Sequence, residues 1–150
     1  MNGRQPGNRH PSLQILHAGV LYFALVFGAG FVLGTIRTLW IVPSLGTRKA
    51  ELMEAPIMFV AIVLAARWVG GRPGLQLSRF ESLAAGVFAL ALLLLTEFTV
   101  MLWIRGLTVA DYLAGRDPVA GMVYVAMLAV FAFMPILLAG QIGERSHKSR

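Results

Sequence analysis

The sequence predicts an all-α membrane protein with four transmembrane helices, and two observations support this prediction. The chain has 150 residues, of which 57% are hydrophobic and only 13% are charged, whereas a soluble domain of this size needs far more charge on its surface. The apolar residues also gather in four runs of about 20 residues or more, the length that crosses ~30 Å of hydrocarbon as a helix. We therefore expect one four-helix transmembrane domain over residues 1–150, without a separate soluble domain.

The first predicted span covers residues 13–42. We expect it to end before Pro43, because a proline disfavours helical geometry in the residue that precedes it. A basic start followed by an apolar run is also typical of a signal peptide, but this run is much longer than the apolar core of a signal. Arg37 and Trp40 occupy the region where small residues would mark a cleavage site. The segment is therefore predicted to stay in the protein as a membrane helix.

The second predicted span covers residues 48–69 and ends at Gly70 and Gly71. It contains Pro56, which has no N–H to donate and is expected to kink the helix. The carbonyl of Leu52 loses its helical donor there, so we expect a polar recess beside the neighbouring carboxylates.

The third and fourth spans begin with recognisable capping residues. Residues 79–104 form the third predicted span, and Ser78 with Glu81 matches a capping box, in which each residue bonds the backbone N–H of the other. Residues 118–142 form the fourth, with Asp117 as its N-terminal cap. Between these two spans, residues 108–115 have a helix-start pattern and a glycine stop, which predicts a short helix lying at the membrane interface.

The distribution of basic residues predicts the orientation. Four spans put both termini on one side, and placing them in the cytoplasm leaves 8 of the 13 Lys and Arg residues inside and 5 outside, as the positive-inside rule requires. The net charge of +6 is then explained by contact with anionic lipid headgroups, and nucleic acid is not an expected partner.

Charged residues inside the predicted spans are the most informative feature of the chain. Arg37, Glu54 and Glu97 lie on three different spans at a similar depth in the outer half of the bilayer, with Glu51 one turn closer to water. Each charge costs several kcal/mol there unless it is paired or hydrated. We therefore predict an intramembrane charge cluster in which Arg37 pairs with Glu54.

Small residues indicate which face of the first span meets another helix. Gly30, Gly34 and Arg37 share one face, and the two glycines form a small-xxx-small pattern that permits close helix approach. Packing within the chain and packing against a second copy are both compatible with this pattern.

Three interpretations of the charge cluster stay open at the level of sequence: an ion-pair cluster that fixes helix register, a site for a ligand, ion or proton, and a contact with a partner subunit. No catalytic residue, metal site or cofactor is predicted. The chain has no cysteine, and its three histidines, His10, His17 and His147, are not placed to ligate haem within the spans.

One composite motif resembles a known pattern. It lies within residues 24–69 and is similar to the segment joining the first two spans in a family of small four-span bacterial membrane proteins that has no assigned activity. The resemblance implies a protein of the bacterial cytoplasmic membrane and brings no substrate, cofactor or reaction. The motif consists of Gly34, Arg37, Pro43, Gly46, Ala50, Glu51, Glu54 and Pro56.

These observations favour an accessory or structural subunit of a larger membrane complex, whose partners are the lipid bilayer and other membrane helices, in a hetero-complex or a homo-oligomer. The alternative is a small proton- or ion-coupled transporter or channel with an outward-facing site formed by Arg37, Glu54 and Glu97. An enzyme ranks third, because two carboxylates could serve in acid–base chemistry but nothing positions a nucleophile or cofactor.

Overall fold

The computed structural model describes residues 10–72, 74–75, 77–104, 106, 108, 110 and 117–147, with the backbone alone for 101, 102, 104 and 140–147. All regular structure within these residues is helical, which agrees with the predicted fold class. The elements are α1 (Pro11–Ile36), the π-helix η1 (Arg37–Ile41), α2 (Val42–Leu45), α3 (Thr47–Gly70), α4 (Arg79–Ile104) and α6 (Pro118–His147). The short helix predicted over residues 108–115 lies largely outside the described part of the chain.

Four helices are long and apolar enough to cross a membrane, which confirms the predicted number of spans. Their bounds are Pro11–Leu45, Thr47–Gly70, Arg79–Val100 and Pro118–Ala139. Their outward faces expose large apolar side chains such as Leu64 (61% exposed) and Phe80 (78% exposed). Helices that are apolar on all faces are typical of membrane spans.

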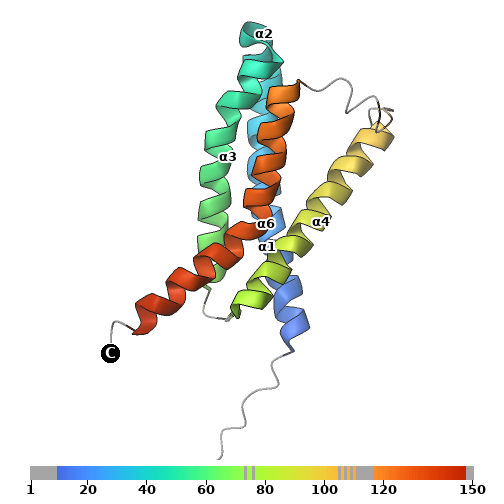
Figure 1. The fold of residues 1–150 in the computed structure, drawn as a ribbon. Coiled ribbons are helices and arrows are strands. Elements are labelled where there is room, and N and C mark those ends of the chain that lie inside the picture. Colours follow the sequence, from blue (N-terminus) through green and yellow to red (C-terminus); the bar gives the residue numbers. More distant parts are fainter. Residues whose placement is uncertain are drawn as a thin grey trace, which may run out of the picture.

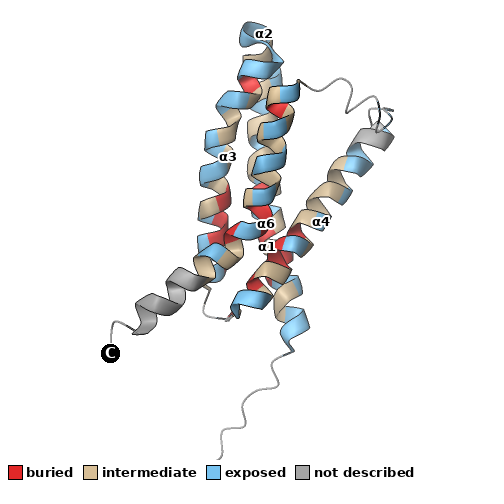
Figure 2. Cartoon of the chain, in the orientation of Figure 1, coloured by how far each residue is buried: buried red, intermediate tan, exposed pale blue. Residues whose placement is uncertain are grey.

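The helices are arranged so that α1 and α6 each contact both α3 and α4, while α3 and α4 lie diagonally opposite. In Figure 1, α4 crosses the bundle near its lower end and leans away from α3 and α6 toward the end where α2 lies. We call that end, which also holds the start of α6, the α2 end. Buried residues gather around the crossing with α4, and few lie near the α2 end (Figure 2).

Small residues hold the helices together at this crossing. A Cβ atom on Gly86 of α4 would overlap the carbonyl group of Ala132 in α6. A Cβ on Gly19 of α1 would lie 2.7 Å from the ring of Phe88 and 3.0 Å from the carbonyl oxygen of Ala85. Dispersion between closely approaching backbones therefore stabilises the contacts of α4 with both α1 and α6.

The first helix continues beyond its predicted end. The prediction ended it at Val42, yet the helix runs through Pro43 to Leu45. The reason is a wider turn before the proline: in η1 the N–H of Val42 donates to the carbonyl of Arg37, the longer-range pattern of a π-helix. Pro43 then falls in the first turn of α2, where a missing N–H costs little.

A single residue joins α2 to α3. Gly46 has φ +79° and ψ 160°, a backbone conformation that is essentially restricted to glycine. The chain reverses direction there and α3 begins at Thr47. The hairpin of the first two spans therefore depends on the absence of a side chain at Gly46.

Both predicted N-terminal caps are confirmed. The N–H of Ser78 donates to Glu81 Oε2 at 2.7 Å, and the N–H of Glu81 donates to Ser78 Oγ at 3.3 Å. Asp117 Oδ1 accepts from the N–H groups of Val119 and Ala120 at 3.0 and 3.1 Å. Asp117 also forms an ion pair with Arg48 at 3.5 Å, which joins the start of α6 to the start of α3.

Candidate ligand-binding cavity

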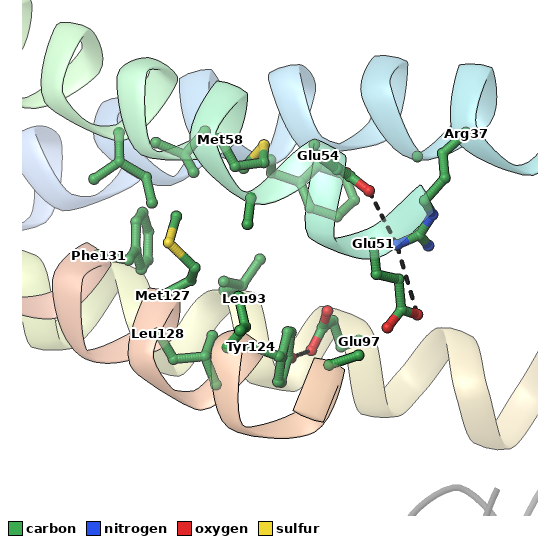
Figure 3. A pocket seen from close by; sticks show the side chains of 18 of the residues that line it. Arg37, Glu51, Glu54, Met58, Leu93, Glu97, Tyr124, Met127, Leu128 and Phe131 are labelled. Carbon is green, nitrogen blue, oxygen red and sulfur yellow. Dashed lines mark hydrogen bonds and ion pairs between the residues drawn. The ribbon is translucent and has the colours of Figure 1, made fainter. Parts of the chain in front are cut away.

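A cavity of about 310 Å³ lies among α1, η1, α3, α4 and α6. Figure 3 shows charged side chains at one end of it and apolar side chains at the other. The charged end faces the α2 end of the bundle, because η1 leads directly into α2. All four charged residues that the sequence predicts to cluster line this cavity: Arg37, Glu51, Glu54 and Glu97.

The structure places Arg37 between the two glutamates of α3. Its Nη1 atom lies 3.0 Å from Glu54 Oε2 and 3.7 Å from Glu51 Oε1. The exposed fractions of the side chains are 30% for Arg37, 21% for Glu51 and 15% for Glu54. Glu54 Oε2 is itself buried and lacks a hydrogen bond of good geometry within the described residues. Its contact with Arg37 is therefore an ion pair and not an aligned hydrogen bond.

Glu97 belongs to a different interaction. The hydroxyl of Tyr124 in α6 donates to Glu97 Oε2, and in Figure 3 Glu97 lies across the cavity from Arg37. The hydroxyls of Thr96 and Thr99, beside Glu97, do not donate to its carboxylate. They donate instead to carbonyls of their own helix, at 2.8 and 2.7 Å. The structure thus brings all the predicted charges to one cavity, but on two separate walls.

Sequence reasoning missed Tyr124, although a signal for it exists. The residues of α6 that line the cavity recur at the spacing of one helical face, and Tyr124 is the polar member of that set. They are Ala120, Val123, Tyr124, Met127, Leu128 and Phe131. A tyrosine on the inward face of an otherwise apolar span is a candidate partner for an intramembrane carboxylate.

The two glycines of the predicted packing face also line the cavity. A Cβ on Gly30 would lie 3.5 Å from the terminal methyl of Met58, and a Cβ on Gly34 would have nothing within 4 Å. Their missing side chains therefore widen the cavity. Close helix approach within the chain occurs instead at Gly19 and Gly86.

Pro56 lies inside α3 without ending it. The carbonyl that lacks a helical donor, on Leu52, belongs to a residue that lines the cavity beside Glu51 and Glu54. Pro56 thus lies within two turns of both carboxylates along α3.

The lining has a formal excess of negative charge. Arg37 supplies one positive charge and the three glutamates supply three negative charges, which leaves an excess of two when all four are ionised. The opposite end is apolar and rich in flexible and aromatic side chains. It includes Met58, Leu93, Met127, Leu128 and Phe131. Among the described residues no group of three His, Cys, Asp or Glu is placed to hold a metal ion.

No family model matches the chain, and neither a curated protein nor a solved structure shows significant similarity to it. The class of protein is therefore defined by the fold and the cavity. Four apolar helices of spanning length give the architecture of a multi-pass membrane protein. Within them lies an amphipathic cavity with charged side chains at one end.

Proposed function

We propose that the protein is a small membrane transport protein that admits a ligand or ion to this cavity from the α2 end. One observation supports the proposal above all: the cavity of about 310 Å³ is lined by all four residues of the intramembrane charge cluster. Pockets for small molecules begin at about 300 Å³, and ionisable residues within spans typically mark substrate or ion pathways. A transport role is the alternative interpretation of the sequence, and the geometry of the cavity supports it better than the accessory role.

The proposed location is the bacterial cytoplasmic membrane, with both termini in the cytoplasm and the α2 end outside. The excess of basic residues on the side of the termini and the motif around Arg37 support it. Single cysteines test the orientation, because the natural chain has none. A cysteine at Arg48 should react with an impermeant maleimide in intact cells, and one at Arg72 should react only after lysis. The reverse pattern would contradict the orientation.

Solvent access to the cavity tests the transport proposal without knowledge of the ligand. Met58 lines the cavity, whereas Val60, two residues further along α3, is 53% exposed on the outside of the helix. A cysteine at Met58 should react with a small impermeant thiol reagent, because thiols need water to ionise. A cysteine at Val60 should stay unreactive in lipid. Equal protection of both positions from both sides of the membrane would contradict a transport pathway.

An accessory subunit is a second candidate, and the position of α4 favours it. Toward the α2 end this helix leans away from α3 and α6 (Figure 1), and Leu95 on it is 66% exposed. A partner helix fits such a face. A photoreactive amino acid at Leu95 should then crosslink to one distinct protein in native membranes. Crosslinks to lipid alone would argue against this role.

A further inference from the structure

We propose that the ligand of this cavity is an amphipathic cation, with an ammonium-type head at the charged end and a short apolar body directed toward Phe131. The inference rests on the proposed function and adds the chemical class of the ligand. It depends on the charge, the shape and the chemistry of the cavity lining.

Charge favours a cation over an anion. The cavity lining carries three carboxylates and one guanidinium. The guanidinium of Arg37 is already engaged by Glu54 and Glu51, so a ligand meets the remaining negative charge. In a site of low dielectric this excess repels an anion and attracts a cation.

Glu97 supplies the position for the cationic head. It lies on α4, on the wall of the cavity opposite Arg37 (Figure 3), so a cation beside it avoids the guanidinium. The hydroxyl of Tyr124 donates to Glu97 Oε2 and holds the carboxylate in place. The ring of Tyr124 also lines the cavity, and aromatic rings attract ammonium groups through their π-faces.

The apolar end favours an organic occupant over a bare inorganic ion. Met58, Met127 and Phe131 offer no oxygen ligands from their side chains, but they pack well against hydrocarbon. A volume of about 310 Å³ equals the share of roughly ten water molecules in the liquid. The lining therefore suits an organic cation with on the order of ten non-hydrogen atoms.

The ammonium group that binds in the cavity can come from two sources: a free amphiphile or the amine headgroup of a phospholipid. Both place an ammonium beside Glu97, and both require the cavity to be open. Binding of a soluble probe tests the shared chemistry, and competition by lipid then separates the two sources.

The test measures thermal unfolding of the purified full chain in a neutral maltoside detergent. Octyltrimethylammonium should raise the unfolding midpoint by several degrees in a concentration-dependent way, because a ligand that binds only the folded state stabilises it. Octanesulfonate, with the same chain and the opposite charge, should not. Glu97→Gln should weaken the apparent affinity for the cation at least tenfold. Glu81→Gln is the matched control, since Glu81 caps α4 away from the cavity and glutamine preserves a capping box.

A second pair of variants keeps the result independent of any loss of folding. Gly34 and Gly28 lie on the same helix, and a Cβ on either has nothing within 4 Å, but only Gly34 lines the cavity. Gly34→Leu should therefore fold normally and lose the cation-induced shift. Gly28→Leu should keep the shift. A shift that survives in Gly34→Leu would place the cation elsewhere and overturn the inference.

The remaining outcomes separate the ligand class from the function. Stabilisation by octanesulfonate that Gly34→Leu abolishes would overturn the cationic class and leave the cavity as a binding site. No shift with either probe in the wild-type chain, together with an unreactive cysteine at Met58, would overturn both proposals. Phosphatidylethanolamine that displaces the probe would identify a lipid amine as the source, and failure to displace it would identify a free amphiphile. Either result supports the ammonium chemistry.

Discussion

The hydroxyl of Tyr22 in α1 donates a hydrogen bond of 2.9 Å to the carbonyl of Phe131 in α6. That carbonyl would normally accept from the residue four positions later, which is Pro135 and has no N–H. The two rings also stack, with centroids 4.6 Å apart and planes at 15°. Tyr22 and Phe131 are the largest fully buried side chains among the described residues. A residue of the first span therefore supplies the donor that the proline removes from the last.

Tyr22→Phe should destabilise the fold by about 1–3 kcal/mol, because it leaves a buried carbonyl unpaired while keeping the ring stack. The measurement is SDS-induced unfolding followed by circular dichroism. Pro135→Ala provides the matched background, since the substituted alanine regains an N–H that can donate to Phe131 as the helix straightens. In that background the cost of Tyr22→Phe should shrink, and an equal cost in both would show that the hydrogen bond is not the cause.

Arg37→Met should destabilise the protein by about 3 kcal/mol, the lower end of the cost of breaking a buried ion pair, because 30% of the arginine side chain is exposed. Glu54→Gln should destabilise it as well, and the double variant should recover much of the loss. Arg48→Met is the control, since Arg48 is 57% exposed in its pair with Asp117 and such pairs contribute at most about 1 kcal/mol. Strictly additive effects at Arg37 and Glu54 would contradict their coupling.

Gly86→Ala should be among the most destabilising single-methyl changes in the chain, because the new Cβ would overlap the carbonyl of Ala132 and force α4 and α6 apart. Gly28→Ala, with nothing within 4 Å of the added Cβ, should be neutral or slightly stabilising through helix propensity. Thermal unfolding in detergent compares the two. Similar midpoints for both variants would mean that the crossing of α4 and α6 is looser than the structure shows.

Gly46→Ala should cost about 1–3 kcal/mol, because φ +79° with ψ 160° is strained for any residue with a side chain. Gly74→Ala serves as the loop control: the structure records no positive φ and no neighbour within 4 Å at that position. Denaturant titration of the purified variants gives both free energies. A loss at Gly46 no greater than that at Gly74 would remove the strain argument for the hairpin.

Local patterns in the sequence predicted the helices well. The hydropathy pattern predicted the four spans. The caps at Ser78 and Asp117 could be predicted because their hydrogen bonds join residues that are close in sequence. The π-helical turn before Pro43 was not predicted. A proline after a helical run usually indicates that the helix ends there, and the sequence does not distinguish the two cases.

Contacts between helices were harder to predict. The charged residues of the first three spans could be grouped by depth, but the partner of Glu97 depends on the rotation of α6, which places Tyr124 opposite it. The Gly30 and Gly34 pattern indicated a close helix contact, whereas Gly19 and Gly86 occupy the crossing points. A small residue permits close approach, and the packing of the whole bundle decides which small residues are used.

The single-residue connection at Gly46 also has a consequence for biosynthesis. Arg37, Glu51 and Glu54 all belong to the hairpin that Gly46 closes. An ion pair within this hairpin can form as soon as α3 follows α1 into the bilayer, before α4 and α6 are synthesised. The cost of a lone charge within a span is thereby reduced at the earliest stage of insertion. Glu97 enters later, and the hydroxyl that holds it arrives only with Tyr124 on the last helix. The cavity therefore acquires its last negative charge late, in a membrane where the arginine of the first hairpin is already paired.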